Sequence, residues 1–190
     1  MKNNYLYKLS GLSGLLLPIV FTILLAFSII ENPWFNWKEN AISDLGNVNG
    51  SPLIFNTGLI IAGLLLLIFS LGFLISYKEK LGPTVLFTCS FLIIGVGTYP
   101  TPEPLHEAFS GVFFITFSLS FLIIGSTANR REILDSFRIF KLIALFAFIV
   151  ACLSLIIYFV YSWVAISEIV IIYPGLIWCM IYGIRLLSLE

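Results

Sequence analysis

Charged residues are scarce in this chain of 190 residues: they make up 11% of it, ten basic and ten acidic, so the formal net charge is zero. Hydrophobic residues make up 59%, and the mean hydropathy is +1.06. A soluble globule of this length would lack the polar residues needed to cover its surface. Water is therefore not the only solvent of this protein, and the balanced charge gives no reason to expect a nucleic acid partner.

Metal-binding side chains are also few, with three cysteines and one histidine. Cys89, Cys152 and Cys179 all fall inside long apolar segments, at no spacing typical of a metal site, so we interpret them as packing residues. No row of carboxylates crosses these segments, which argues against a proton or cation pump.

What the chain has in abundance is long apolar runs, six in number. Each is close to the roughly 20 residues that span the hydrocarbon layer of a membrane. The runs are 9–30, 53–77, 83–99, 109–128, 139–161 and 166–187. Inside lipid every backbone N–H and C=O must be satisfied within its own segment, so the runs are predicted to be helices. We predict an all-α polytopic membrane protein, a bundle of six transmembrane helices forming one domain over residues 1–190.

The distribution of basic residues predicts the orientation of the bundle. With the N-terminus in the cytoplasm, nine of the ten basic residues fall in inner segments and one, Lys38, in an outer segment. The inner ones are Lys2, Lys8, Lys78, Lys80, Arg130, Arg131, Arg138, Lys141 and Arg185. Both termini are therefore predicted to be cytoplasmic.

The first predicted outer loop, residues 31–52, is long and rich in side chains that bind ligands, among them Trp37, Glu39 and Asn40. Trp37, Ala41 and Leu45 recur at a spacing of four residues, which predicts a short interfacial helix over 37–45. Gly46 then provides a natural C-terminal stop for this helix.

The second predicted outer loop, residues 100–107, has prolines at three alternate positions and so cannot continue a helix. We expect a stiff extended segment that ends where the fourth helix begins. The single histidine, His106, then lies at an outer helix end, and Tyr99, Glu103 and Glu107 close to it are further candidates for ligand binding.

Together the two loops supply a hydroxyl, a carboxylate and an imidazole. One hypothesis is nucleophilic hydrolysis, with Ser43 as the nucleophile, Asp44 as the orienting group and His106 as the general base. A second is a divalent metal site that combines His106, Asp44 and one of three glutamates and activates a water molecule. Those glutamates are Glu39, Glu103 and Glu107.

Two further interpretations of the same residues remain open. In the first they are architectural, with Ser43, Asp44 and His106 capping turns and helices; in the second they bind a ligand or a lipid headgroup without chemistry. Glu168, near the start of the sixth run, either joins this polar cluster or lies exposed at the membrane surface.

Particular segments resemble a known family. The sequence Asn40-Ala41-Ile42-Ser43-Asp44-Leu45-Gly46, the segment 51–56 after it, and the segment 104–114 with His106 resemble the prokaryotic membrane family labelled domain of unknown function 998. The Ile-Ser-Asp element and the later histidine also resemble, more distantly, the eukaryotic DRAM and Frag group of six-span proteins.

The resemblance implies six spans, a location in the prokaryotic plasma membrane and, through the eukaryotic group, lipid as the ligand class. We therefore expect an outer polar site that binds, and in one version hydrolytically remodels, a lipid or lipid-linked headgroup. The alternatives are a noncatalytic protein that organises the membrane or interacts with other proteins, and a transporter of small solutes. The oligomeric state is not predicted.

Overall fold

The computed structural model describes residues 2–47, 52–127 and 137–188. Within these residues the chain forms six α-helices and one short 3-10 helix, without any strand. The elements are α1 (Lys2–Glu31), η1 (Ile42–Gly46), α2 (Pro52–Ser76), α3 (Leu81–Thr98), α4 (Pro104–Thr127), α5 (Phe137–Tyr161) and α6 (Val164–Leu187). All six α-helices are long and apolar enough to cross a membrane. The prediction of an all-α, six-helix membrane bundle is confirmed.

Most helix boundaries lie close to the predicted apolar runs, but α1 begins at Lys2, seven residues before the predicted run at Leu9, and α4 also begins early. Helix α4 begins at Pro104, five residues before the predicted run at Phe109. Proline fits the first turn of a helix because that turn does not need its missing N–H group. His106 therefore lies in the first turn of α4, at the helix end as predicted, but the predicted loop over 100–107 is too long because residues 104–107 are helical.

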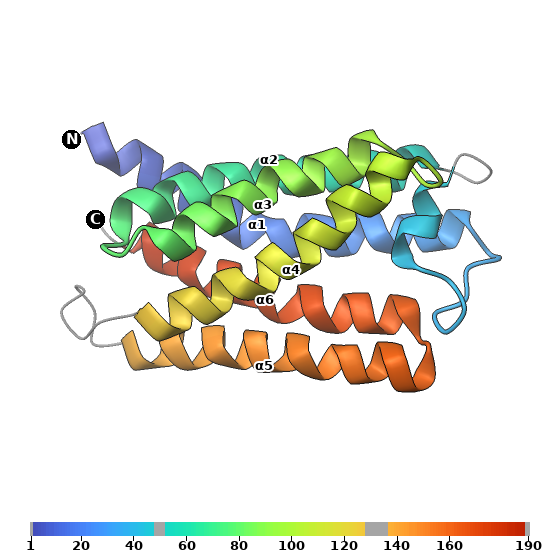
Figure 1. Cartoon of the computed structure of the whole chain (residues 1–190). Helices are drawn as coiled ribbons and strands as arrows, with labels where there is room; N and C mark the ends of the chain where they lie inside the picture. The colour runs from blue at the N-terminus through green and yellow to red at the C-terminus, as the bar shows by residue number, and fades with distance from the viewer. Residues whose placement is uncertain (1, 48–51, 128–136, 189–190) are drawn as a thin grey trace.

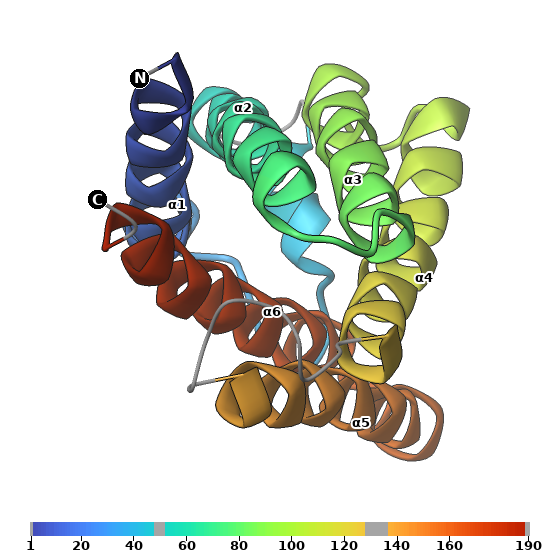
Figure 2. The same ribbon diagram turned by 90° about the vertical axis from the view of Figure 1, so that its left-hand side faces the viewer.

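The helices are arranged as an incomplete ring around a central space. Helices α1, α2, α3 and α4 pack successively side by side, and α6 packs against α1 on the other side of the ring (Figure 2). Helix α5 lies outside this ring against α4 and α6. Helix α4 lies against α3 at both of its ends, where Gly95 meets Phe109 and Gly82 meets Ile124, and α4 and α6 separate from one another towards the end opposite the chain termini (Figure 1).

The contact between α1 and α6 depends on glycine. A Cβ atom added to Gly183 would lie 2.6 Å from the carbonyl oxygen of Gly11, and one added to Gly14 would lie 2.7 Å from the carbonyl oxygen of Cys179. Small residues let helix backbones approach closely. Inside lipid the hydrophobic effect does not drive helix association, so this close packing holds the helices together.

Both ends of the chain lie at the same end of the bundle (Figure 1). We call the opposite end, which carries η1 and the segments 32–41, 99–103 and 162–163, the capped end. The cytoplasmic location of the termini stays a prediction from the charge distribution, as does the outer location of the capped end. Residues 48–51 of the first predicted loop, and Arg130 and Arg131, lie outside the described residues.

Candidate functional site at the capped end

The element η1 closes the capped end of the central space. It packs against α2 and α6, and in the end-on view it lies behind the middle of the ring (Figure 2). Its apolar side chains Ile42 and Leu45 are 4% and 0% exposed. A five-residue helix has too few internal hydrogen bonds to be stable alone, so its position is set by its contacts with the bundle.

Two carboxylates hold the start of η1. The backbone N–H of Ala41 donates to Oδ2 of Asp44 at 2.8 Å, and the N–H of Ile42 donates to a carboxylate oxygen of Glu168 at 2.6 Å. The first N–H groups of a helix have no partner within the helix, and these bonds satisfy two of them. Because Glu168 belongs to α6, its bond attaches η1 to the wall of the bundle.

The other end of η1 is attached to α2. The side-chain amide of Asn56 donates to the carbonyl oxygen of Gly46 at 3.0 Å. A Cβ atom at Gly46 would collide with Oδ1 of Asn56 and lie 2.9 Å from Cδ1 of Phe55. Glycine at this position therefore allows η1 to lie directly on α2.

The predicted interfacial helix over 37–45 is wrong in extent, because the 3-10 helix covers Ile42–Gly46. Upstream of it, the side chain of Asn40 accepts a bond from the N–H of Asn36 at 2.8 Å, and the side chain of Asn36 accepts one from the N–H of Lys38 at 3.0 Å. Such local bonds from side chain to backbone compete with helix formation. The predicted stop at Gly46 is confirmed.

His106 is buried in the first turn of α4, with 5% of its surface exposed. Its Nδ1 lies 2.9 Å from the carbonyl oxygen of Tyr99. A carbonyl oxygen only accepts hydrogen bonds, so Nδ1 must carry the proton and Nε2 of the neutral ring is an acceptor. This Nε2 is buried and has no hydrogen-bond partner among the described residues.

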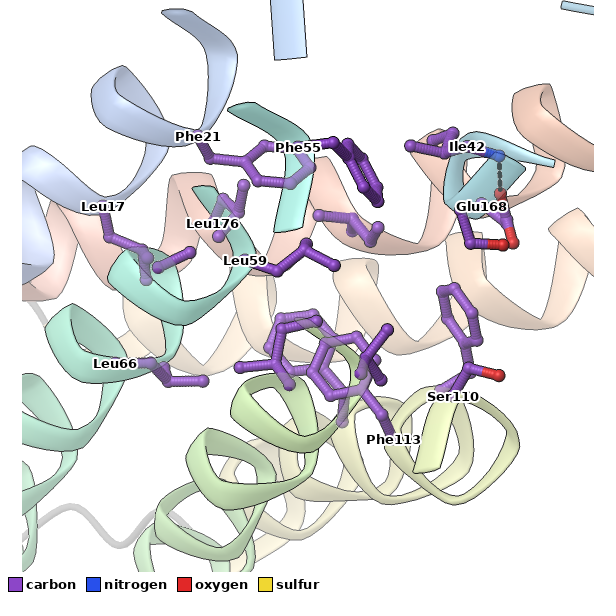
Figure 3. A pocket seen from close by; sticks show the side chains of 17 residues that line it. Leu17, Phe21, Ile42, Phe55, Leu59, Leu66, Ser110, Phe113, Glu168 and Leu176 are labelled. Atoms are coloured by element: carbon purple, nitrogen blue, oxygen red, sulfur yellow. Dashed lines mark hydrogen bonds between the residues drawn. The ribbon is translucent and has the colours of Figure 1, made fainter. Parts of the chain in front are cut away.

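An elongated pocket runs from η1 into the bundle (Figure 3). Its cavity volume is about 60 Å³, and the pocket is partly open to the surroundings. Its lining comes from α1, α2, α3, α4, α6 and η1. The lining residues are Leu17, Phe21, Ile42, Ser43, Phe55, Leu59, Ala62, Leu66, Ile93, Val96, Ser110, Phe113, Phe114, Phe117, Glu168, Ile172 and Leu176.

The polar residues of this lining are grouped at one end. Ser43 belongs to η1, Ser110 to the second turn of α4, and Glu168 to the first turns of α6. Leu17 and Leu66 lie at the other end of the pocket (Figure 3). The pocket is thus bordered by polar residues at the capped end, while nearly all of its exposed surface is apolar.

The structure places the three predicted catalytic residues close to the cap but does not connect them. Ser43 lines the pocket, Asp44 caps η1, and His106 is bonded to the backbone of Tyr99. In the described part of the chain no hydrogen bond joins any two of these three side chains. The backbone carbonyl of Tyr99, rather than Asp44, orients the imidazole.

The remaining predicted binding residues surround the cap. The ring of Tyr99 stacks on Phe109 with 5.6 Å between centroids, and Trp37 is 39% exposed. The carbonyl oxygen of Asn40 accepts the N–H of Ala165 at 3.1 Å, which links the loop to α6. The side chains of Glu39, Glu103 and Glu107 are exposed.

A metal site at this end would need several ligands to converge. Among the described residues, no group of three or more His, Cys, Asp or Glu side chains is close enough to hold a metal ion. The predicted combination of His106, Asp44 and a glutamate is therefore not assembled in this structure.

Two residues of the site, Glu168 and Ser110, were indicated weakly or not at all by the sequence. Glu168 was expected either to join the polar cluster or to lie exposed at the membrane surface, and in the structure it joins the cluster through its bond to Ile42. Ser110 was not predicted. The signal that could have found it is its position four residues after His106, which puts both on one face of α4.

These features define the class of protein: a multi-pass integral membrane protein of six helices, with an apolar pocket closed at one end by a hydrogen-bonded cap. The chain belongs to the family described as Protein of unknown function (DUF998), whose sequence profile matches residues 15–185. The resemblance drawn from the sequence is thereby confirmed for this family. No curated protein and no solved structure matches the chain.

Proposed function

We propose that this protein binds a membrane lipid, with a hydrocarbon chain in the central pocket and the polar headgroup at the capped end. The observation that carries the proposal is an apolar pocket with polar residues at its border on one end. Apolar side chains line most of its length, while Ser43, Ser110 and Glu168 gather at the η1 end. An amphiphile has the same polarity along its own length, so its two parts would each meet matching surroundings.

The divergence of α4 and α6 supports entry from the side. Ser110 and Phe114 of α4 and Ile172 of α6 all line the pocket, and the two helices separate towards the capped end (Figure 1). A lipid that enters between them would not have to leave the membrane. Since its chain exchanges lipid for an equally apolar pocket, chain burial gives little net affinity. Discrimination would therefore come from the headgroup.

The geometry favours binding over the two other activities considered. Hydrolysis requires a nucleophile in hydrogen-bond contact with its base, and Ser43 and His106 are not in such contact. A solute transporter requires polar groups along its path, whereas the polar lining of this pocket is confined to one end. A protein that senses or organises lipids without turnover is compatible with the same site.

The test is to fill the pocket. Ala62 lines it from the middle of α2 and is 5% exposed. The substitution Ala62→Phe places a ring in the space reserved for the chain. Ala26→Phe is the matched control because Ala26 is exposed on α1. We expect the lipid that copurifies with the protein in detergent, measured by native mass spectrometry, to fall several-fold for Ala62→Phe alone.

The proposal fails if folded Ala62→Phe protein, eluting as a single peak like the wild type, retains the same amount of bound lipid. It also fails if wild-type protein carries no lipid and takes up none when lipids are added. If Ala62→Phe does not fold, Ala62→Leu is the smaller version of the same change, and the same criterion applies to it.

A further inference from the structure

The geometry points to an uncharged, hydroxyl-bearing headgroup, such as that of a diacylglycerol, as the ligand of the capped end, with Nε2 of His106 accepting its hydroxyl. This inference rests on the proposed lipid site and deepens it. It depends on the proton position on His106, on the place of His106 in α4, and on the charges around the cap.

The proton position follows from the contact with Tyr99. Because the N–H at Nδ1 donates to the carbonyl oxygen of Tyr99, Nε2 of the neutral imidazole carries a lone pair. A buried acceptor without a partner is unfavourable, by about 1–3 kcal/mol in proteins generally. This nitrogen is one of several such atoms among the described residues, together with Oδ1 of Asn56, which is also an acceptor. A ligand hydroxyl that reaches Nε2 would satisfy this nitrogen.

The helical register places His106 beside the polar end of the pocket. Ser110, Phe113 and Phe117 follow it at four, seven and eleven residues, a spacing that keeps all four on one helix face. The latter three line the pocket, and His106 is buried on the same face one turn closer to the cap. The hydroxyl of Ser110 donates to the carbonyl of Glu107 at 3.2 Å, so its oxygen remains available as an acceptor.

This end of the pocket offers no cation to a phosphate. The pocket lining contains the acidic side chain of Glu168 and no lysine or arginine, and the carboxylate of Asp44 is near enough to interact with Glu168. The basic residue of this end, Lys38, lies over the ring of Trp163 at 5.0 Å from its centroid. Like charges at a binding site suppress the wrong ligand. An ammonium group would match the carboxylates, but a charge is far harder to bury than a hydroxyl.

The experiment compares two lipids with identical chains, dioleoylglycerol and dioleoylphosphatidic acid, as competitors for radiolabelled dioleoylglycerol on the purified full-length protein in detergent. The key variant is His106→Asn. Its amide nitrogen occupies the place of Nδ1 and retains the bond to Tyr99, but the acceptor at Nε2 is lost. Methyl oleate, which has a chain but no donor, reports on the pocket alone.

We expect wild-type protein to bind dioleoylglycerol at least tenfold more tightly than dioleoylphosphatidic acid. His106→Asn should weaken dioleoylglycerol binding by about threefold to tenfold, the effect of one hydrogen bond, and leave methyl oleate binding unchanged. His106→Gln, whose side-chain oxygen reaches towards the position of Nε2, should recover part of the loss.

Three results would overturn the inference. Tighter binding of dioleoylphosphatidic acid would indicate an anion site instead. Equal binding of both lipids, or no effect of His106→Asn in folded protein, would show that the headgroup is not recognised, while the pocket proposal would survive. Failure to bind any of the three compounds would remove the proposed function itself.

Discussion

The two ends of the central pocket are closed in different ways. Away from the cap, one turn beyond Leu66 and Leu176, the bundle is filled by aromatic rings. Phe69 and Phe73 lie with centroids 6.2 and 5.2 Å from that of Trp178, and Phe121 lies 5.5 Å from it. At the capped end the closing element is η1, held by hydrogen bonds to the side chains of Glu168 and Asn56.

This difference indicates where specificity is located. Aromatic packing closes a space by shape, and the tyrosine hydroxyls of this cluster are engaged within the bundle, as in the bond from the hydroxyl of Tyr77 to the carbonyl oxygen of Ile124. A cap held by carboxylate and amide side chains closes the space and also places hydrogen-bonding atoms beside it. We therefore assign stability mainly to the packed end and recognition to the capped end.

The largest effect is expected at the close contact between α1 and α6, where Gly183 meets Gly11. A Cβ at Gly183 would lie 2.6 Å from the carbonyl of Gly11 and 3.0 Å from the N of Leu15, so Gly183→Ala forces the backbones of α1 and α6 apart. We expect a loss of about 3 kcal/mol in the free energy of unfolding, the upper part of the range for overpacking. The measurement is the midpoint of thermal unfolding in detergent.

Gly111→Ala is the matched control for this change. A Cβ at Gly111 meets nothing within 4 Å, and alanine favours helix by about 1 kcal/mol over glycine. Its unfolding midpoint should stay constant or rise. Similar losses in both variants would contradict the assignment of close packing to the contact between α1 and α6.

An intermediate effect is expected at the attachment of the cap to α6. Glu168→Ala leaves the N–H of Ile42 without its acceptor, which typically costs about 1–3 kcal/mol. Glu168→Gln keeps an oxygen for the same bond and should be milder. Hydrogen–deuterium exchange of a peptide covering η1 should become faster in Glu168→Ala, with little change around Phe69 and Trp178. Uniformly faster exchange would mean that the two ends are not independent.

A smaller effect is expected at the attachment of the cap to α2. Gly46→Ala requires the side chain of Asn56 to move, and its bond to the carbonyl of residue 46 is then lost. Since a side chain moves more easily than a backbone, we expect a loss of about 1 kcal/mol, the worth of one hydrogen bond. The loss in free energy of lipid binding should exceed the loss in free energy of unfolding. Unchanged binding would separate the cap from the lipid site.

The smallest effect is expected for the local cap of η1. Asp44→Ala removes the acceptor for the N–H of Ala41, and the loss of a comparable cap typically costs about 1 kcal/mol. Exchange at residues 41–47 should rise slightly, and the unfolding midpoint should barely change. A complete loss of lipid binding without unfolding would instead point to direct contact between Asp44 and the ligand.

The sequence identified most residues of the candidate site but not how they are arranged in space. The loop with Ser43 and Asp44 and the helix start with His106 were both identified from the sequence. The helix over 37–45 was not, because bonds from Asn36 and Asn40 to the loop backbone compete with it. The apolar pocket has no sequence signature, since its lining residues look like any other apolar residues of the spans.

The sequence by itself determined the number of helices, their approximate ends and the family. Lipid accepts only long apolar segments with internally satisfied backbones, so each span is defined locally. The tertiary structure alone decided how the spans enclose a pocket and what closes it. The bond between Ile42 and Glu168 joins residues 126 positions apart, and no local pattern encodes such a contact, because it depends on how α6 and η1 pack around the same space.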